Sequence, residues 1–370
     1  MKTGTVNLPL HGGKCPPWLF KRMRELAKAI TQIIITEYSQ TEILKRISDP
    51  YWFQALSCVL GYDWHSSGTT TVTCGALKEA IKPEEFGIAV CGGKGKTSRK
   101  TLTEIEKISD IFGLSTCKID ELKYASRLSA KVDNSCVQDG YQLYHHCFIF
   151  TENGEWTVVQ QGMNLNYARR YHWLSDTVKT FVSEPHTCIF CDKIEEKVLN
   201  LTAKESEETR KTSVDLIKDN PEHLQKYFNL QYQNQKLLTE FTMPKHHPVL
   251  QIDLSKQGMK VLQKVHEIQP KDYEELVAFR GIGPKSLRAL ALISNIIYGT
   301  NPSWKDPAKY SFAHGGKDGY PYPVNQKVYD TSIQTLKQAI ENAKIGNKEK
   351  LSAIKRLNGF VNFKMSKPKN

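Results

Sequence analysis

The chain has 370 residues, 39% of them hydrophobic and 24% charged. This length predicts two or three domains with buried cores, and the composition excludes a membrane protein, a collagen or coiled-coil fibre and a wholly disordered chain. Lys and Arg number 51 against 39 acidic residues, a formal net charge of +12, which favours a polyanionic partner such as nucleic acid.

Residues 1–182 predict a mixed α+β domain. Apolar residues at helical spacing indicate a helix from Trp18 to Tyr38, with Pro16-Pro17 at its start. Two more helices and a short strand are expected over Tyr51–Gly61, Thr69–Ile81 and Phe86–Val90.

A loop rich in glycine and lysine, residues 92–100, follows that strand. It contains four basic residues and no acidic residue, and it ends in Gly-Lys-Thr like a phosphate-binding P-loop. A P-loop needs a glycine five residues before Gly95, and Val90 stands there, which argues against nucleotide hydrolysis. The sequence instead predicts a flexible basic loop that touches nucleic-acid phosphates through Lys94 and Lys96; an idle surface loop is the alternative.

Two strands, Tyr141–Thr151 and Glu155–Met163, are predicted to form a hairpin. Asn153-Gly154 between them is the preferred dipeptide of a two-residue type I′ turn. This turn would pair His146 with Gln161 and Cys147 with Gln160. Both faces carry apolar residues near the turn, so the hairpin is expected to be buried on both sides.

Polar side chains gather at the far end of this hairpin. Their types suit anion binding and proton transfer, because His serves as an acid or base near neutral pH and Arg holds phosphate bidentately. The cluster consists of His145, His146, Gln160, Gln161, Arg169 and Arg170. His146 is the favoured general base. Asp63, His65 and His11 are candidates to join it, and the alternative is a polar network that only completes the sheet.

The cysteine pattern argues for a reducing compartment. Nine cysteines are scattered through a long chain that has neither a signal peptide nor an apolar run of the roughly 20 residues that a membrane helix needs, which predicts a cytoplasmic protein. His186, Cys188 and Cys191 offer three closely spaced ligands without a second half-site, so incidental cysteines are the better interpretation. A divalent metal at the polar cluster stays open as a cofactor.

The strongest motif lies in the second half of the chain. Residues 183–250 are interpreted as a charged helical connector and residues 251–345 as a mainly helical domain. Within that domain, Glu275 to Leu290 has the form of a helix-hairpin-helix, in which two glycines shape a tight turn and a proline begins the second helix. The residues predicted to contact phosphate are Gly281, Gly283, Lys285 and Arg288.

This segment resembles the helix-hairpin-helix of DNA repair and recombination proteins, which implies a DNA-backbone contact without sequence readout. A DNA glycosylase or lyase that uses Lys285 to form a Schiff base is a less favoured alternative. Asp306 and Asp318 lie further along the chain than that family's aspartate.

The C-terminus is strongly basic. The last 27 residues hold eight basic residues and one acidic residue, a net +7 (8 − 1). Residues 346–370 are expected to form a basic tail that adds salt-sensitive phosphate attraction; a solvated terminus without function is the alternative.

Several long strings identify a family resemblance. LPLHGGKCPPWLF, SDPYWFQALSCVLGYDWHSSGTTT, QDGYQLYHHCFIF and FAHGGKDGYP look like an archaeal and bacterial family, Domain of Unknown Function seven-six-three. The resemblance implies a prokaryotic cytosolic protein and no established activity. The residues favour a protein that processes DNA by phosphodiester cleavage, with DNA preferred over RNA; a non-enzymatic DNA-binding protein is the alternative.

Overall fold

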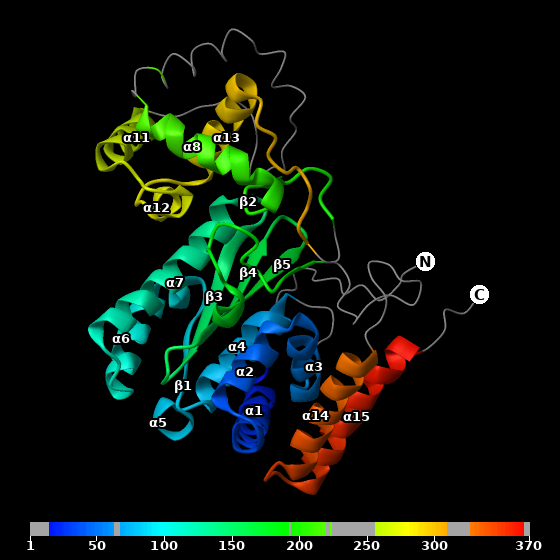
Figure 1. Ribbon diagram of the computed structural model, residues 1–370. Coiled ribbons are helices and arrows are strands. Elements are labelled where there is room, and N and C mark those ends of the chain that lie inside the picture. The colour runs from blue at the N-terminus through cyan, green and yellow to red at the C-terminus, as the bar shows by residue number, and fades with distance from the viewer. Residues whose placement is uncertain are drawn as a thin grey trace, which may run out of the picture.

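The structure, a computed structural model, describes residues 15–62, 67–191, 194–219, 223, 256–308 and 326–365. Its class is α+β, as the sequence predicts. One antiparallel sheet is covered by helices on both faces, and a further group of helices lies at one end of it (Figure 1). The buried hairpin predicted from the sequence is the centre of that sheet.

The sheet has five strands in the order β1-β3-β4-β5-β6, and all neighbours are antiparallel. Their bounds are β1 Ile88–Lys94, β3 Gln142–Thr151, β4 Trp156–Met163, β5 Ala168–Leu174 and β6 Cys188–Phe190. Because side chains alternate along a strand, Ile149 and Val159 enter one core cluster while Phe148 and Val158 enter another. A second, two-stranded sheet pairs β2 (Val137–Gln138) with β7 (Leu199–Asn200).

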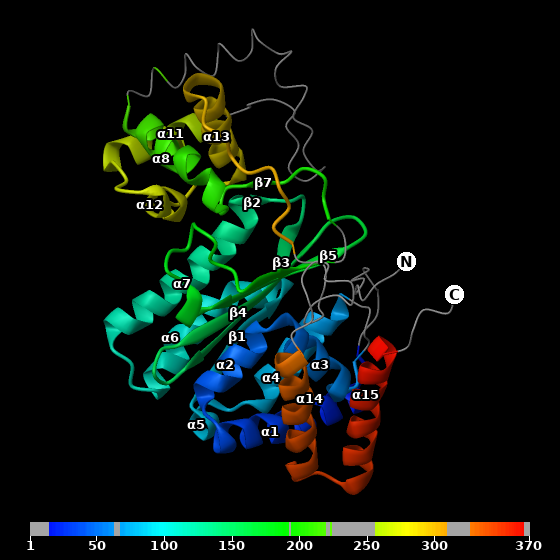
Figure 2. The ribbon, with the colours of Figure 1, turned by 45° about the vertical axis from the view of Figure 1, so that its right-hand side comes forward.

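One face of the sheet is covered by α1 to α4, and α14 and α15 pack outside them (Figures 1 and 2). The bounds of the helices on this side are α1 Pro17–Glu37, α2 Gln40–Ser48, α3 Pro50–Leu60, α4 Gly68–Ala80, α5 Pro83–Phe86, α14 Gln326–Asn342 and α15 Asn347–Met365. Asp49 fixes the start of α3, because its carboxylate accepts the backbone N–H of Tyr51 at 2.7 Å and of Trp52 at 3.1 Å. The three predicted helices of this half each begin and end one residue earlier than expected.

The other face of the sheet is covered by α6 and α7, and a group of four helices continues from them (Figure 2). The bounds are α6 Thr101–Ile111, α7 Thr116–Ser135, α8 Glu207–Lys218, α11 Lys256–Ile268, α12 Tyr273–Ala278 and α13 Pro284–Tyr298, with short 3₁₀ turns η1 Gly95–Lys100, η2 Ser175–Thr177 and η3 Lys204–Ser206. Leu276 and Leu290 of this group share one core cluster with Phe148 of the sheet. Among the described helices, none combines the length and the apolar character needed to cross a bilayer.

The predicted register of the β3–β4 hairpin is wrong by one residue. Thr151 pairs with Glu155 through the N–H of Thr151, and three residues form the loop, ending in Gly154 with φ +81°. A three-residue loop with a left-handed glycine last is the next most common hairpin connection after the two-residue type I′ turn. As a result His146 lies opposite Gln160 and not Gln161.

Two other segments differ from their predicted character. Residues 346–370 do not form a solvated tail throughout, because α15 buries Ala353 and Leu357 in the core cluster that contains α3. The predicted helical connector, residues 183–250, contains β6 and β7 as well as α8. Short strands of two or three residues have no periodicity long enough to be recognised in a sequence.

Candidate functional site

The polar cluster at the sheet end is divided into three separate groups. His145 and His146 point to opposite faces of β3, as do their partners Gln161 and Gln160 on β4. Arg170 shares the face of His145, and Arg169 lies with acidic residues elsewhere. The six residues predicted to converge therefore do not form one site.

His146 belongs to a closed hydrogen-bond chain between the sheet and α7. Its Nε2 lies 2.8 Å from the Ser126 hydroxyl, and its Nδ1 lies 2.9 Å from Gln160 Oε1. The Gln160 amide nitrogen donates at 2.6 Å to Asp133, whose other oxygen lies 2.5 Å from Nε2 of His186.

The direction of this chain follows from the amide of Gln160. Its nitrogen donates to Asp133, so its oxygen faces His146. His146 then carries its proton on Nδ1 and accepts the Ser126 hydroxyl at Nε2. Burial lowers the pKa of His146 to about 4, which keeps it neutral at pH 7. Both ring nitrogens are occupied, so this arrangement leaves no lone pair for a substrate.

On the opposite face, a polar row crosses four adjacent strands, β1, β3, β4 and β5, and β6 adds a phenyl ring. Register pairs Lys94 with His145, His145 with Gln161, Gln161 with Arg170, and Arg170 with Phe190. Gln161 contacts the hydroxyls of Thr70 and Tyr144 and donates to the carbonyl oxygen of Ser67. Lys94 is the exposed end of this row.

His145 is the anomaly in the row, because it is 1% exposed and neither ring nitrogen has a hydrogen-bond partner among the described residues. Burial, the neighbouring His146 and Lys94 lower its pKa to about 3, so it is neutral at pH 7. A buried polar group without a partner needs a physical explanation, and a ligand or an ordered water is one.

Arg170 carries a buried charge without an acidic partner in the described part of the chain. Its guanidinium lies between two phenyl rings, 4.7 Å from the Phe53 centroid and 5.0 Å from the Phe190 centroid. It donates to Gln54 Oε1 at 3.0 Å, and burial lowers its pKa to about 10. The cation–π contacts offset part of the desolvation cost, so Arg170 supports packing as well as being a candidate anion ligand.

Arg169 holds the third group together. Its guanidinium donates to Asp139 at 2.9 Å and bidentately to Asp306 at 2.9 and 2.7 Å, and all three side chains are buried. Tyr171 also donates to Asp139, at 2.7 Å. Arg169 is therefore an internal ion-pair centre and not the phosphate ligand predicted, and Asp306 is bound here.

The predicted loop at residues 92–100 consists of a strand end and a 3₁₀ turn. β1 continues to Lys94, and η1 follows with the side chains of Lys96, Arg99 and Lys100 exposed. Gly92 has φ +85°, and a Cβ there would stand 2.2 Å from the carbonyl oxygen of His146, so only glycine fits. The loop keeps its exposed cations, which lie on a strand end and a 3₁₀ turn.

Metal-binding groups do not gather in the described residues: no three His, Cys, Asp or Glu side chains there could hold an ion together. His186 binds Asp133, Cys188 joins the core on the α1–α4 side, and Cys191 contacts the carbonyl oxygen of Ala168. All nine cysteines are free thiols. His11, Asp63 and His65 lie outside the described residues.

The second candidate site is the hairpin at residues 279–283, between α12 and α13. Gly281 has φ +104°, and a Cβ there would approach Val261 of α11 to 3.0 Å, whereas Gly283 is extended with open space around it. No side chain caps α13 and its first turn has no acidic residue. Lys285 is exposed beside this helix start, and so is Arg280. Exposed N–H groups and cations at a helix N-terminus suit an anion.

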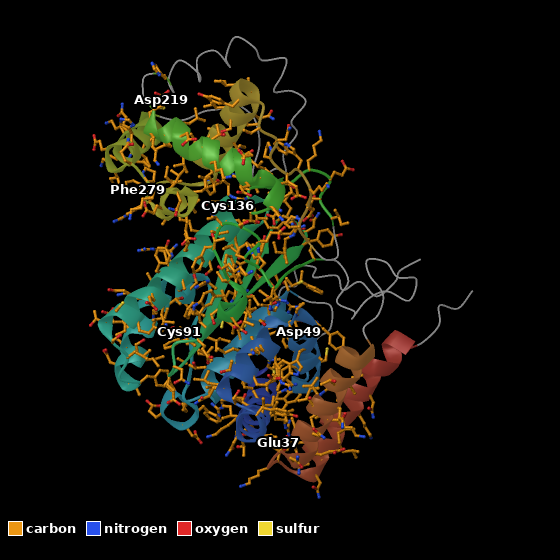
Figure 3. The ribbon with its side chains drawn as sticks, viewed as in Figure 1. Glu37, Asp49, Cys91, Cys136, Asp219 and Phe279 are labelled. Carbon is orange, nitrogen blue, oxygen red and sulfur yellow. The ribbon has the colours of Figure 1, made fainter. Side chains whose placement is uncertain are left out.

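Three contacts fix this hairpin to the body of the protein. Lys131 of α7 donates to the Phe279 carbonyl oxygen, and Gln138 of β2 donates to that of Pro284 at 2.9 Å. Figure 3 labels Phe279 in the helical group next to the end of α7 that carries Cys136. Arg288, predicted to contact phosphate, is instead buried and donates to Gln138 Oε1 at 3.1 Å.

Residues 4–324, which include both candidate sites, match the family described as Protein of unknown function (DUF763). The chain belongs to the DUF763 family. Neither a curated protein nor a solved structure matches it. For this DUF763 member, the argument for a function therefore depends on its own geometry.

Sequence reasoning missed the residues of α7 that close the hydrogen-bond chain of His146 and that hold the hairpin at residues 279–283. Asp133, Ser126 and Lys131 all lie on α7, and none stands near the hairpin or sheet motifs in the sequence. Ser126 and Asp133 are two helical turns apart, which places these two on one buried face, whereas Lys131 lies on a half-exposed face. That spacing was the available signal, but it does not say which strand the face covers.

Proposed function

We propose that this protein binds the DNA backbone without reading sequence, through the hairpin at residues 279–283 and the start of α13. The observation that carries the proposal is a helix N-terminus with no capping side chain, flanked by the exposed cations Arg280 and Lys285 and fixed to the body by Lys131 and Gln138. Backbone N–H groups and cations bind phosphate without contacting base edges. The formal net charge of +12 adds a favourable long-range field.

Binding to duplex DNA tests this proposal directly. We expect the Arg280→Ala/Lys285→Ala double variant to bind a fluorescein-labelled duplex roughly tenfold more weakly at 100 mM salt, with a shallower salt slope, because two phosphate contacts are lost. The matched control is Arg24→Ala on α1, which removes a cation on the other side of the sheet. Equal affinity of both variants, each folded, would exclude the hairpin as the contact.

Phosphodiester cleavage is a second candidate, and the polar row that contains His145 favours it. His145 is neutral with both ring nitrogens unused among the described residues, and the exposed Lys94 and Lys96 stand at the open end of its row. We propose His145, and not the fully bonded His146, as the acid or base of such a reaction. A reducing cytoplasm suits nine free thiols.

A cleavage assay separates the two functions. His145→Leu and wild type are compared on single-stranded and duplex DNA, with and without Mg²⁺ or Mn²⁺. We expect at least a hundredfold loss of cleavage in the variant with unchanged DNA affinity. Absence of cleavage by wild type in every condition would leave the binding function alone.

A further inference from the structure

A stripe of basic residues on α7 leads to the hairpin. Lys123, Arg127 and Lys131 are spaced by four residues, so they follow one face of the helix, and successive members are about 6 Å apart along its axis. Lys131 contacts the hairpin itself through the Phe279 carbonyl oxygen. Lys131 therefore joins this stripe to the hairpin, which is the proposed DNA contact.

Within the described part of the chain, two members of the stripe keep an unpaired charge. Lys123 is bound to Glu106 at 3.4 Å, whereas the described residues give neither Arg127 nor Lys131 an ion pair. Two acidic residues at the start of α12, which packs against α7, are engaged elsewhere: Glu274 accepts from the Tyr124 hydroxyl at 3.0 Å and from the Phe181 N–H at 3.0 Å, and Asp272 caps α12.

We propose that Arg127 and Lys131 bind the phosphate backbone of duplex DNA as a continuation of the hairpin contact. This rests on the proposed DNA-binding function. The roughly 6 Å between them is close to the axial separation of every second phosphate on one strand, roughly 7 Å. Two exposed or half-exposed cations at that spacing, next to the hairpin that Lys131 contacts, can follow one strand.

Lys131 gives this surface a pH dependence. Burial and the neighbouring Arg127 lower its pKa to about 8, and Cys136 acts in the opposite direction. On the hairpin, Arg280 is the cation next to Phe279, the residue that Lys131 contacts. Glu275 of α12 is ion-paired with Lys271. A phosphate beside the amine favours its protonated form, so DNA binding takes up a proton where the free amine is partly neutral. Affinity therefore falls as the pH rises from 7 to 9.

The experiment measures duplex affinity by anisotropy at pH 7 and 9, over 50–200 mM salt, for wild type, Arg127→Ala, Lys131→Arg, Arg280→Ala/Lys285→Ala and the control Arg24→Ala. We expect Arg127→Ala to lower the salt slope by about 0.9, the value for one phosphate contact. Wild type should lose up to about tenfold in affinity between pH 7 and 9, since one pKa unit corresponds to a tenfold change. Lys131→Arg keeps its charge and its donor to Phe279, so most of that loss should disappear.

The outcomes separate this inference from the proposed function. No duplex binding by wild type overturns both. If the hairpin double variant loses affinity while Arg127→Ala matches Arg24→Ala and Lys131→Arg keeps the wild-type pH profile, only the α7 contact is wrong. Thermal melts of each variant establish that a lost contact, and not unfolding, causes any change.

Discussion

The sheet end and the α12–α13 hairpin contain similar residue types and use them in opposite ways. At the sheet end, His146, Arg169 and Gln160 are buried and bonded to one another or to Asp133, Asp139 and Asp306. At the hairpin, Arg280 and Lys285 face solvent while Gln138 and Arg288 bond inside. Residue type alone therefore does not identify a functional site; the number of polar atoms left without an internal partner is the better criterion.

The largest effect should come from breaking the buried ion pairs. Asp306→Ala removes the bidentate partner of Arg169 and leaves a fully buried guanidinium with less compensation. We expect the free energy of unfolding to fall by about 3–5 kcal/mol, measured by urea denaturation. The control is Asp176→Ala, which removes an exposed pair with Lys45 and should cost less than about 0.5 kcal/mol. Similar small losses in both variants would show that the sheet end is not held by this pair.

The two neighbouring histidines provide the next comparison. His146→Leu leaves the Ser126 hydroxyl and the Gln160 oxygen buried without partners, so we expect a loss of about 2–3 kcal/mol at pH 7. His145→Leu removes two nitrogens that already lack partners among the described residues and should change stability by less than about 1 kcal/mol. Denaturant titration of both variants measures the difference. The opposite order would mean that His145 holds an internal partner such as ordered water.

Acid should weaken the fold through the same residues. The pKa of His145 is lowered to about 3 and that of His146 to about 4, below the value of roughly 6.5 in an unfolded chain. Between pH 6.5 and 4 the unfolded state binds protons that the folded state does not, so stability falls as the pH falls, by up to about 1.4 kcal/mol per pH unit for each histidine. Well above pH 6.5 both imidazoles are neutral in the folded and the unfolded state, so neither contributes a slope. His145→Leu should therefore show a shallower loss between pH 7 and 5 than wild type.

The two hairpin glycines differ in what they tolerate. Gly281 has a positive φ and Val261 stands against its open side, so Gly281→Ala should cost about 2 kcal/mol. Gly283 is extended and a Cβ there would meet open space, so Gly283→Ala should be neutral or slightly stabilising. Thermal melts measure stability, and duplex binding then shows whether Gly281→Ala loses affinity beyond its loss of fold. Equal costs at both positions would contradict the backbone geometry.

The sequence predicted long-period features well and pairwise geometry poorly. Helices with apolar residues at helical spacing, such as Pro17–Glu37, were placed to within one residue, because their period is read over many positions. The β3–β4 register was wrong because Asn153-Gly154 fits both a two-residue turn and the end of a three-residue loop. The separation of Arg169 from Arg170 follows from strand alternation, but their partners Asp306 and Gln54 are more than a hundred residues away.

On the C-terminal helix α15, two adjacent basic residues show the same contrast between an internally bonded and an exposed cation. Arg356 donates from Nε and Nη2 to the Val59 carbonyl oxygen at 2.9 and 2.6 Å, at the end of α3, where cations are favoured, while Lys355 is exposed. Arg356→Ala should reduce the free energy of unfolding by about 1 kcal/mol, because one charged donor to a helix C-terminus is lost. Lys355→Ala should leave stability unchanged and alter only the salt slope of DNA binding, if α15 contributes to it. Denaturant titration measures the stability of both variants, and anisotropy measures the salt slope of their DNA binding. A stability loss at Lys355 with none at Arg356 would mean that α15 packs through its other face.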